Sequence, residues 1–225
     1  MPTTTISNTS SLDRLLSEAD HALRVIAGKQ PASARFPAPA ANATEPGSQF
    51  SEEQLSGEQR KRSAGLMRVN HSGEVCAQAL YRGQALTAKL EHTRAEMDAA
   101  AEEELEHLSW CEQRLDDLDS HTSALNPLWY AASFGLGAAA GLVSDRLSLG
   151  FVAATEDQVC RHLSEHLAKL PEQDVESRAV VEQMLADEAQ HADRARTAGA
   201  MEFPAPLKSA MTAVSRLMTR SSYFI

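Results

Sequence analysis

Two motifs of the same type occur in the chain, and each places a histidine three residues after a glutamate. They are Glu104 with His107 and Glu188 with His191. A further glutamate precedes each motif, by 30 residues in the first case and by 32 in the second. Residues three apart share one face of a helix, so each motif would present a carboxylate and an imidazole together. The repeated set is Glu74, Glu104, His107, Glu156, Glu188 and His191.

The four glutamates fall within apolar stripes of helical spacing, which predicts that they face a protein interior. Glu104, for example, shares its stripe with Met97, Ala101 and Leu108. Four buried carboxylates would repel one another, whereas two divalent cations would balance their four charges. Carboxylate ligands with one imidazole per metal suit iron or manganese. Four glutamates and two histidines on four helices are the ligand pattern of di-iron proteins with a ferritin-like bundle.

Other acidic and imidazole groups leave alternatives open. Glu103 could also reach His107 in its own helix, but it lies away from the apolar stripe, so Glu104 is the favoured ligand. Asp187 is expected at the surface or behind a ligand, and Asp157 could be either. Residues 162–166 read HLSEH, the inverted signature of zinc peptidases. A zinc site there would leave the repeated glutamates unexplained.

Long helical patterns must position these side chains. We predict core helices over 64–90, 92–119, 145–170 and 173–199, and a final helix over 205–220. Residues 11–28 form an amphipathic pattern, and 30–50 resemble a linker rich in Pro and Ala. No strand-type alternation is convincing. The expected fold is all-α: a ferritin-like four-helix bundle over 51–225 with a long apolar crossover, preceded by an N-terminal segment over 1–50.

The crossover is unusual because residues 127–143 carry no charge. The segment begins with Leu128, Trp129 and Tyr130, which favour membrane interfaces. Seventeen residues with much Gly and Ala make a poor transmembrane span. The segment is therefore either an interfacial element or tunnel wall, or an ordinary buried crossover. The basic amphipathic helix near the C-terminus could lie on anionic lipid or pack on a partner subunit.

Composition excludes some classes of function. The formal net charge of -10 argues against a nucleic-acid partner, since phosphate binding needs a basic surface. Three scattered cysteines without a CxxC pair argue against a disulfide framework and fit a reducing compartment. The N-terminus has neither a secretory signal nor an Arg-rich transit segment, so the bacterial cytoplasm is expected.

Several blocks of the sequence resemble the demethoxyubiquinone hydroxylase family over roughly residues 60–220. They are 67–74 (MRVNHSGE), 81–84 (YRGQ), 104–108 (ELEHL), 126–129 (NPLW) and 187–191 (DEAQH). The resemblance implies that Glu74 and His107 bind one iron, that Glu156 and His191 bind the other, and that Glu104 and Glu188 bridge both. The family's usual HAGE block reads HSGE here, a departure that keeps Glu74 in place.

The resemblance further implies an O2-dependent di-iron monooxygenase that hydroxylates a polyprenylated benzoquinol late in ubiquinone synthesis. No catalytic residue beyond the metal ligands is expected, and no nucleotide-binding fingerprint occurs, so the electrons could come from a partner, NADH or the quinol. Such an enzyme would work peripherally at the cytoplasmic face of the cell membrane, in a biosynthetic complex or as a homo-oligomer. A ferritin-like iron-handling protein and a non-catalytic scaffold are the alternatives. His71 and His162 could either orient a ligand or serve in packing.

Overall fold

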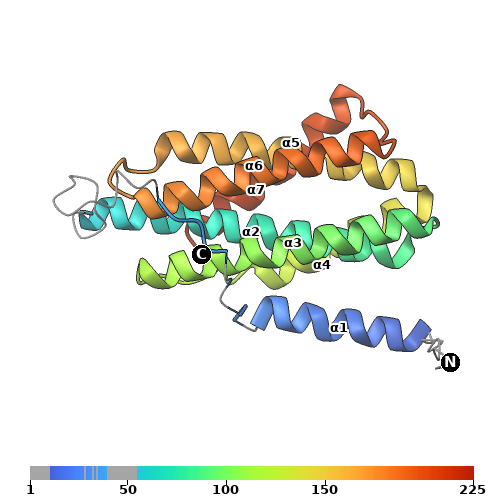
Figure 1. The fold of residues 1–225 in the computed structure, drawn as a ribbon, viewed down its shortest axis with the longest axis horizontal. Helices are drawn as coiled ribbons and strands as arrows, with labels where there is room; N and C mark the ends of the chain where they lie inside the picture. The colour runs from blue at the N-terminus through green and yellow to red at the C-terminus, as the bar shows by residue number, and fades with distance from the viewer. Residues whose placement is uncertain (1–10, 28, 32, 34, 40–54) are drawn as a thin grey trace, which may run out of the picture.

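The computed structural model describes residues 11–27, 29–31, 33, 35–39 and 55–225, and within them all regular structure is helical. The helices are α1 (Ser11–Ala27), α2 (Gly57–Thr87), α3 (Glu91–Asp117), α4 (Asn126–Val143), α5 (Asp145–Lys169), α6 (Val175–Thr197) and α7 (Ala205–Ser222). Figure 1 shows them along the long axis of the molecule. This confirms the prediction of an all-α, ferritin-like helical bundle.

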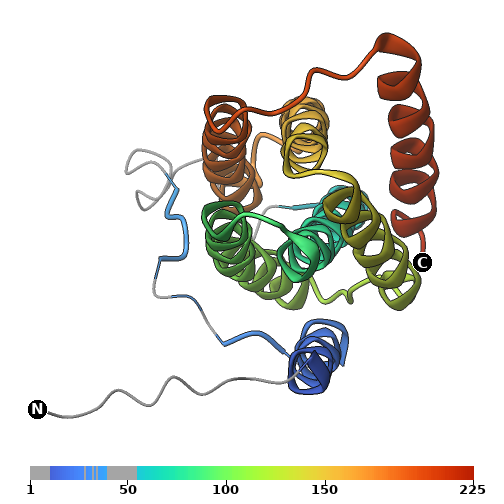
Figure 2. The ribbon, with the colours of Figure 1, turned by 90° about the vertical axis from the view of Figure 1, so that its right-hand side faces the viewer.

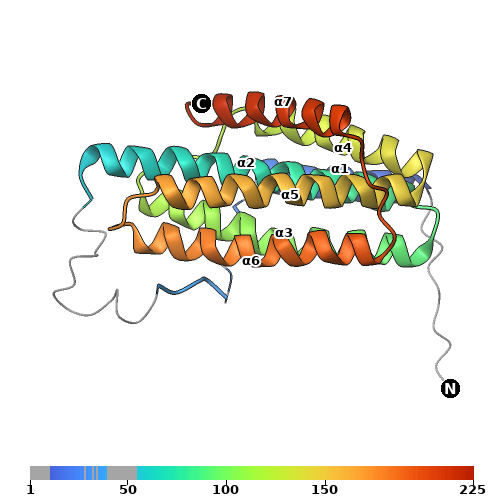
Figure 3. The ribbon, with the colours of Figure 1, turned by 90° about the horizontal axis from the view of Figure 1, so that it is seen from above.

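The bundle consists of two helix pairs, α2 with α3 and α5 with α6, as Figure 2 shows end-on. Each pair is joined by a short connection. Helix α4 crosses between the pairs and packs along α2, and α7 lies against α2 and α5. Seen from above in Figure 3, α4 and α7 lie on the same side of the bundle.

Side-chain caps explain where several helices begin. The Ser56 side chain accepts a hydrogen bond from the backbone N–H of Gln59, and the Gln59 side chain accepts one from the backbone N–H of Ser56, so α2 starts at Gly57. The prediction of 64–90 placed this start too late, because the polar residues before 64 lack an apolar period. Ser144 and Asp174 cap α5 and α6, and the side chain of each accepts a hydrogen bond from a backbone N–H in the first turn.

The uncharged crossover is itself a helix, α4, and it lies on the bundle surface. Its inner side approaches the α2 backbone closely: a Cβ added to Gly137 would lie 2.2 Å from the carbonyl oxygen of Leu80. Its outer side exposes apolar residues, among them Leu128 and Leu142. The segment is therefore half-buried, unlike an ordinary buried crossover. Among the described helices, none combines the length and hydropathy needed to cross a membrane.

The N-terminal helix matches its prediction of 11–28 and packs against α2 and α4. Glu18 pairs with Arg82 of α2, and Val25 is buried. Beyond α1, Lys29 pairs with Asp116 of α3. Residues 40–50 of the expected linker lie outside the described residues, so the division of the chain at residue 50 stays a prediction.

Candidate metal centre

The six residues of the repeated motif meet in the middle of the bundle, although they come from four helices. Glu74 comes from α2, Glu156 from α5, and α3 and α6 each supply one Glu–His pair. All six side chains are buried. They form two groups whose ligand atoms lie within 4.8 Å of one another: Glu74, Glu104, His107 and Glu188 in the first, and Glu156, Glu188 and His191 in the second.

Two carboxylates lie between the two imidazoles. Oε2 of Glu104 is 3.0 Å from Nδ1 of His107, and its Oε1 is 3.2 Å from Nδ1 of His191. Glu188 repeats the pattern, with Oε1 at 3.1 Å from His107 and Oε2 at 3.2 Å from His191. Each of these carboxylates therefore directs one oxygen toward each histidine. Glu74 lies on the His107 side, 3.7 Å from Nδ1.

The cluster has more acceptors than donors. Oε1 of Glu104, Oε2 of Glu156 and Oε1 of Glu188 are buried and have no hydrogen-bond partner among the described residues. A neutral imidazole has one N–H to offer, whereas Nδ1 of His107 faces three carboxylates. Unsatisfied buried oxygens are costly, and cations would satisfy them. The residues present thus fit a site that could hold metal ions.

The ionisation of the metal-free cluster supports this interpretation. Burial raises the pKa of Glu74 and of Glu156 well above the ordinary value. Burial alone would lower the pKa of His191, but the nearby carboxylates of Glu104 and Glu188 raise it to about 11. The cluster therefore holds protons where cations are absent, and binding of metal ions would release them.

The outward-facing nitrogen of each histidine contacts a second acid, and the contacts run crosswise between helices. Nε2 of His107 in α3 is 3.3 Å from Oδ2 of Asp187 in α6. Nε2 of His191 in α6 is 2.6 Å from Oε2 of Glu103 in α3. Arg194 also binds Glu103, which lowers the pKa of that carboxyl to about 2. Each acid immediately precedes a glutamate of the cluster and holds the imidazole of the opposite helix.

These contacts decide between the alternatives that spacing left open. Glu103 reaches His191 across the bundle rather than His107 in its own helix. Asp187 lies behind His107, and Asp157 pairs with Arg196 near the surface. The sequence did not indicate a role for Tyr81, which donates a hydrogen bond to Glu156.

The remaining histidines lie outside the cluster. Nε2 of His71 contacts Glu112 at 3.3 Å. His162 bonds to the hydroxyl of Ser215, and Nδ1 of His166 is 2.6 Å from Oδ1 of Asn70. The glutamate of the HLSEH motif is exposed, and none of the motif's side chains joins a group with metal-ligand spacing among the described residues.

An apolar cavity of about 230 Å³ reaches the cluster at Glu74. It lies between α2, α4, α5 and α7, and apolar side chains such as Trp129, Phe151 and Met218 line most of it. Gly73 also lines it, and a Cβ added there would meet nothing within 4 Å. The cluster is thus accessible to an apolar molecule from the side that carries α4 and α7.

Comparisons with known proteins agree with this site. The family model described as ubiquinone biosynthesis protein COQ7 matches residues 61–222. A 3-demethoxyubiquinol 3-hydroxylase of Ectopseudomonas mendocina is 58% identical over 216 residues, 96% of this chain and 97% of its own length. One of Pseudomonas fluorescens is 55% identical over 222 residues, covering 99% and 100%. The chain belongs to the COQ7 family of ubiquinone biosynthesis proteins.

Proposed function

We propose that this protein is a 3-demethoxyubiquinol 3-hydroxylase, an O2-dependent di-iron monooxygenase of ubiquinone biosynthesis. The observation that carries the proposal is the buried set of four glutamates and two histidines beside an apolar cavity. The names of relatives that are similar over nearly the whole chain support the same activity.

Two irons per chain would be held as the motif repeat suggests. Glu74 and His107 would bind one, Glu156 and His191 the other, and Glu104 and Glu188 would bridge them. The two-sided contacts of Glu104 and Glu188 support the bridging roles. When bound, the iron pair supplies the activation of O2 that hydroxylation of an aromatic ring requires.

The surrounding residues would fix the ligands and exclude water. Asp187 and Glu103 hold the imidazoles with Nδ1 directed at the centre, and Tyr81 holds Glu156. The quinol ring would occupy the apolar cavity beside Glu74, where burial keeps bulk water away from the reacting positions. No further acid or base of the chain is assigned a catalytic role.

The substrate carries a polyprenyl tail, so the protein would work at a membrane surface. The cavity lies between α4 and α7. Exposed apolar side chains in these helices include Leu128, Leu136, Val214 and Leu217, and Phe224 is exposed just beyond the end of α7. Exposed apolar patches of this kind mark membrane or protein contacts. We propose peripheral binding to the cytoplasmic face of the bacterial cell membrane, with a complex or homo-oligomer as the alternative use of this face.

The test is to measure iron content and O2-dependent hydroxylation of a short-tailed demethoxyubiquinol by the purified chain. We expect two irons per chain and conversion of the quinol, and Glu188→Ala should lose both. A Glu188→Ala protein with full activity would overturn the assignment. Iron oxidation without any hydroxylated quinol would instead point to a ferritin-like iron-handling protein.

A further inference from the structure

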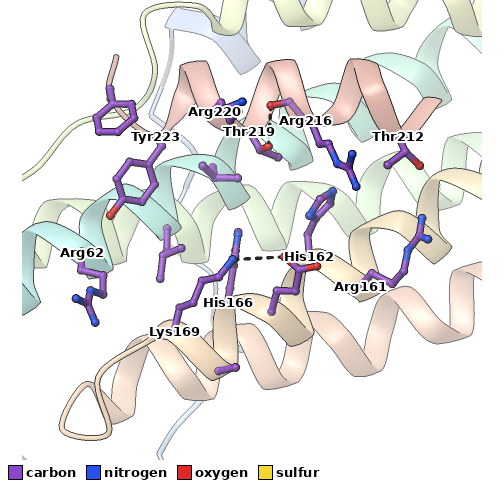
Figure 4. A pocket seen from close by; sticks show the side chains of 15 residues that line it. Arg62, Arg161, His162, His166, Lys169, Thr212, Arg216, Thr219, Arg220 and Tyr223 are labelled. Carbon is purple, nitrogen blue, oxygen red and sulfur yellow. Dashed lines mark hydrogen bonds and ion pairs between the residues drawn. The ribbon is translucent and has the colours of Figure 1, made fainter. Parts of the chain in front are cut away.

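We propose that a basic groove between α2, α5 and α7 binds the phosphate headgroup of an anionic lipid. The inference rests on the proposed work at a membrane surface. The groove has a volume of about 770 Å³ and is separate from the metal centre. Figure 4 shows it, with α7 on one side and α5 on the other. Five cationic side chains line it: Arg62, Arg161, Lys169, Arg216 and Arg220.

The positive charge of the groove is almost uncompensated. Glu165 is the one acid in its lining, and it pairs with Lys169 at 3.4 Å. Within the described part of the chain, no carboxylate lies within 4.0 Å of the four arginines. The chain as a whole carries a formal net charge of -10, so this groove is a local exception. Guanidinium groups suit phosphate because they donate paired hydrogen bonds to its oxygens.

The two histidines of the groove do not add to this charge near neutral pH. Burial lowers the pKa of His166 to about 4, and it also lowers the pKa of His162. The attraction for an anion therefore comes from the arginines and the lysine.

The surroundings of the groove favour a lipid over a soluble anion. Leu217 and Phe224 are 63% and 79% exposed, and they neighbour Arg216 and Arg220 along the C-terminal segment. The groove also shares lining residues, including Val69 and Thr219, with the apolar cavity that reaches the metal centre. A ligand with a phosphate next to acyl chains satisfies both features, whereas a soluble phosphate would leave the apolar residues uncovered.

A headgroup in this groove would hold α7 against the bilayer and keep the neighbouring cavity near the lipid phase. The test is sedimentation of the full chain with vesicles of phosphatidylcholine, with or without added phosphatidylglycerol. We expect strong preference for the anionic vesicles. The double variant Arg161→Gln/Arg216→Gln should bind them roughly 30-fold more weakly, since each basic residue near an anionic surface contributes about 1 kcal/mol.

The matched control is Lys61→Gln/Arg24→Gln, which removes the same charge from exposed positions outside the groove. It should bind anionic vesicles like the unchanged chain. A second pair, Lys169→Gln/Arg220→Gln, should repeat the loss, with unchanged helical circular dichroism as the check on folding.

Three results would overturn the proposal: equal binding to both vesicle types, an equal loss in the control, or binding of inorganic phosphate by the lipid-free chain that Arg161→Gln/Arg216→Gln abolishes while vesicle binding stays unchanged. The last would assign the groove to a soluble anion. Hydroxylation of a short-tailed quinol in detergent by the unchanged chain tests the proposed function separately. An active enzyme without lipid preference would remove only the groove proposal, and an inactive chain that prefers anionic vesicles would remove only the proposed function.

Discussion

The hydroxyl oxygen of Tyr81 lies 2.6 Å from Oε1 of Glu156, and both side chains are fully buried. The bond joins α2 to α5 inside the candidate metal centre. Glu156 accepts this hydrogen bond through Oε1. The other oxygen of Glu156 has no hydrogen-bond partner among the described residues. The geometry leaves that oxygen free to bind a cation while Tyr81 fixes the carboxylate.

We expect Tyr81→Phe to weaken one of two metal sites, because Glu156 loses the donor that orients it. Loss of an outer contact of this kind typically lowers metal affinity by about 10- to 100-fold. Competition against a chromophoric chelator would measure both affinities. Tyr130→Phe is the matched control, since the Tyr130 hydroxyl is buried and has no hydrogen-bond partner in the described part of the chain. Two unchanged affinities in Tyr81→Phe would contradict the assigned role.

Glu103 and Asp187 each contact the histidine of the opposite helix, so substitution of either acid should weaken one metal site and not the other. Glu103→Gln should weaken the metal bound by His191, and Asp187→Asn should weaken the metal bound by His107, because each acid orients the imidazole of the opposite helix. The expected loss is again about 10- to 100-fold in affinity. Glu102→Gln, at the exposed neighbouring position, should change neither metal. Equal effects of Glu102→Gln and Glu103→Gln on metal affinity would show that these variants act through the net negative charge near the site and not through the orientation of an imidazole.

The sequence predicted the members of the cluster because their signals are local. A three-residue spacing and an apolar stripe place Glu104 and His107 on one inward face without knowledge of any other helix. The contacts of Glu103 with His191 and of Tyr81 with Glu156 join different helices. They depend on how the helices are rotated and shifted against one another, which no single periodic pattern contains. Spacing alone therefore left His107 open as a partner of Glu103, and only the packing of the helices shows the contact with His191.

The helical state of residues 126–143 was also beyond the sequence pattern. This segment has apolar or small residues on every side, so no polar face marks it as a surface helix. Its packing is decided by small residues that let α4 approach the α2 backbone. The start of α2, by contrast, was readable in principle from the Ser56–Gln59 capping box.

Gly137 and Gly135 provide a matched test of that packing. A Cβ at Gly137 would lie 2.2 Å from the carbonyl oxygen of Leu80, whereas one at Gly135 would meet nothing within 4 Å. Gly137→Ala should lower the free energy of unfolding by about 1–3 kcal/mol, because two backbones must separate. Gly135→Ala should raise it by up to about 1 kcal/mol through helix propensity. Urea denaturation of both variants checks the difference, and equal shifts would contradict the close α2–α4 contact.

His166 should make stability fall in mild acid. Burial lowers its pKa to about 4, with smaller contributions from His162 and Lys169, whereas an unfolded histidine titrates near 6.5. Between these values the unfolded chain binds more protons, so the free energy of unfolding decreases as pH falls from about 6.5 to 4, by at most about 3 kcal/mol.

Denaturation at several pH values would measure this slope in the unchanged chain and in His166→Gln. The variant should be less stable at neutral pH, where it loses the bond to Asn70, but it should lose less stability on acidification. The same change at the exposed His92 controls for loss of an imidazole. An identical pH slope in His166→Gln and the unchanged chain would contradict the prediction.

Substitutions at Gly73 distinguish an effect on the proposed substrate cavity from an effect on the metal centre. It precedes Glu74, lines the cavity, and offers open space to an added side chain. Gly73→Ala should stabilise α2 by up to about 1 kcal/mol and keep most of the cavity. Gly73→Leu should fill the cavity where the quinol ring is proposed to lie. We therefore expect both variants to bind two irons. Gly73→Ala should turn over at a near-normal rate. Gly73→Leu should lose at least about tenfold in kcat/KM, equivalent to about 1.4 kcal/mol. A fully active Gly73→Leu protein would place the quinol elsewhere, whereas loss of iron in that variant would show that the added side chain disturbs Glu74 instead.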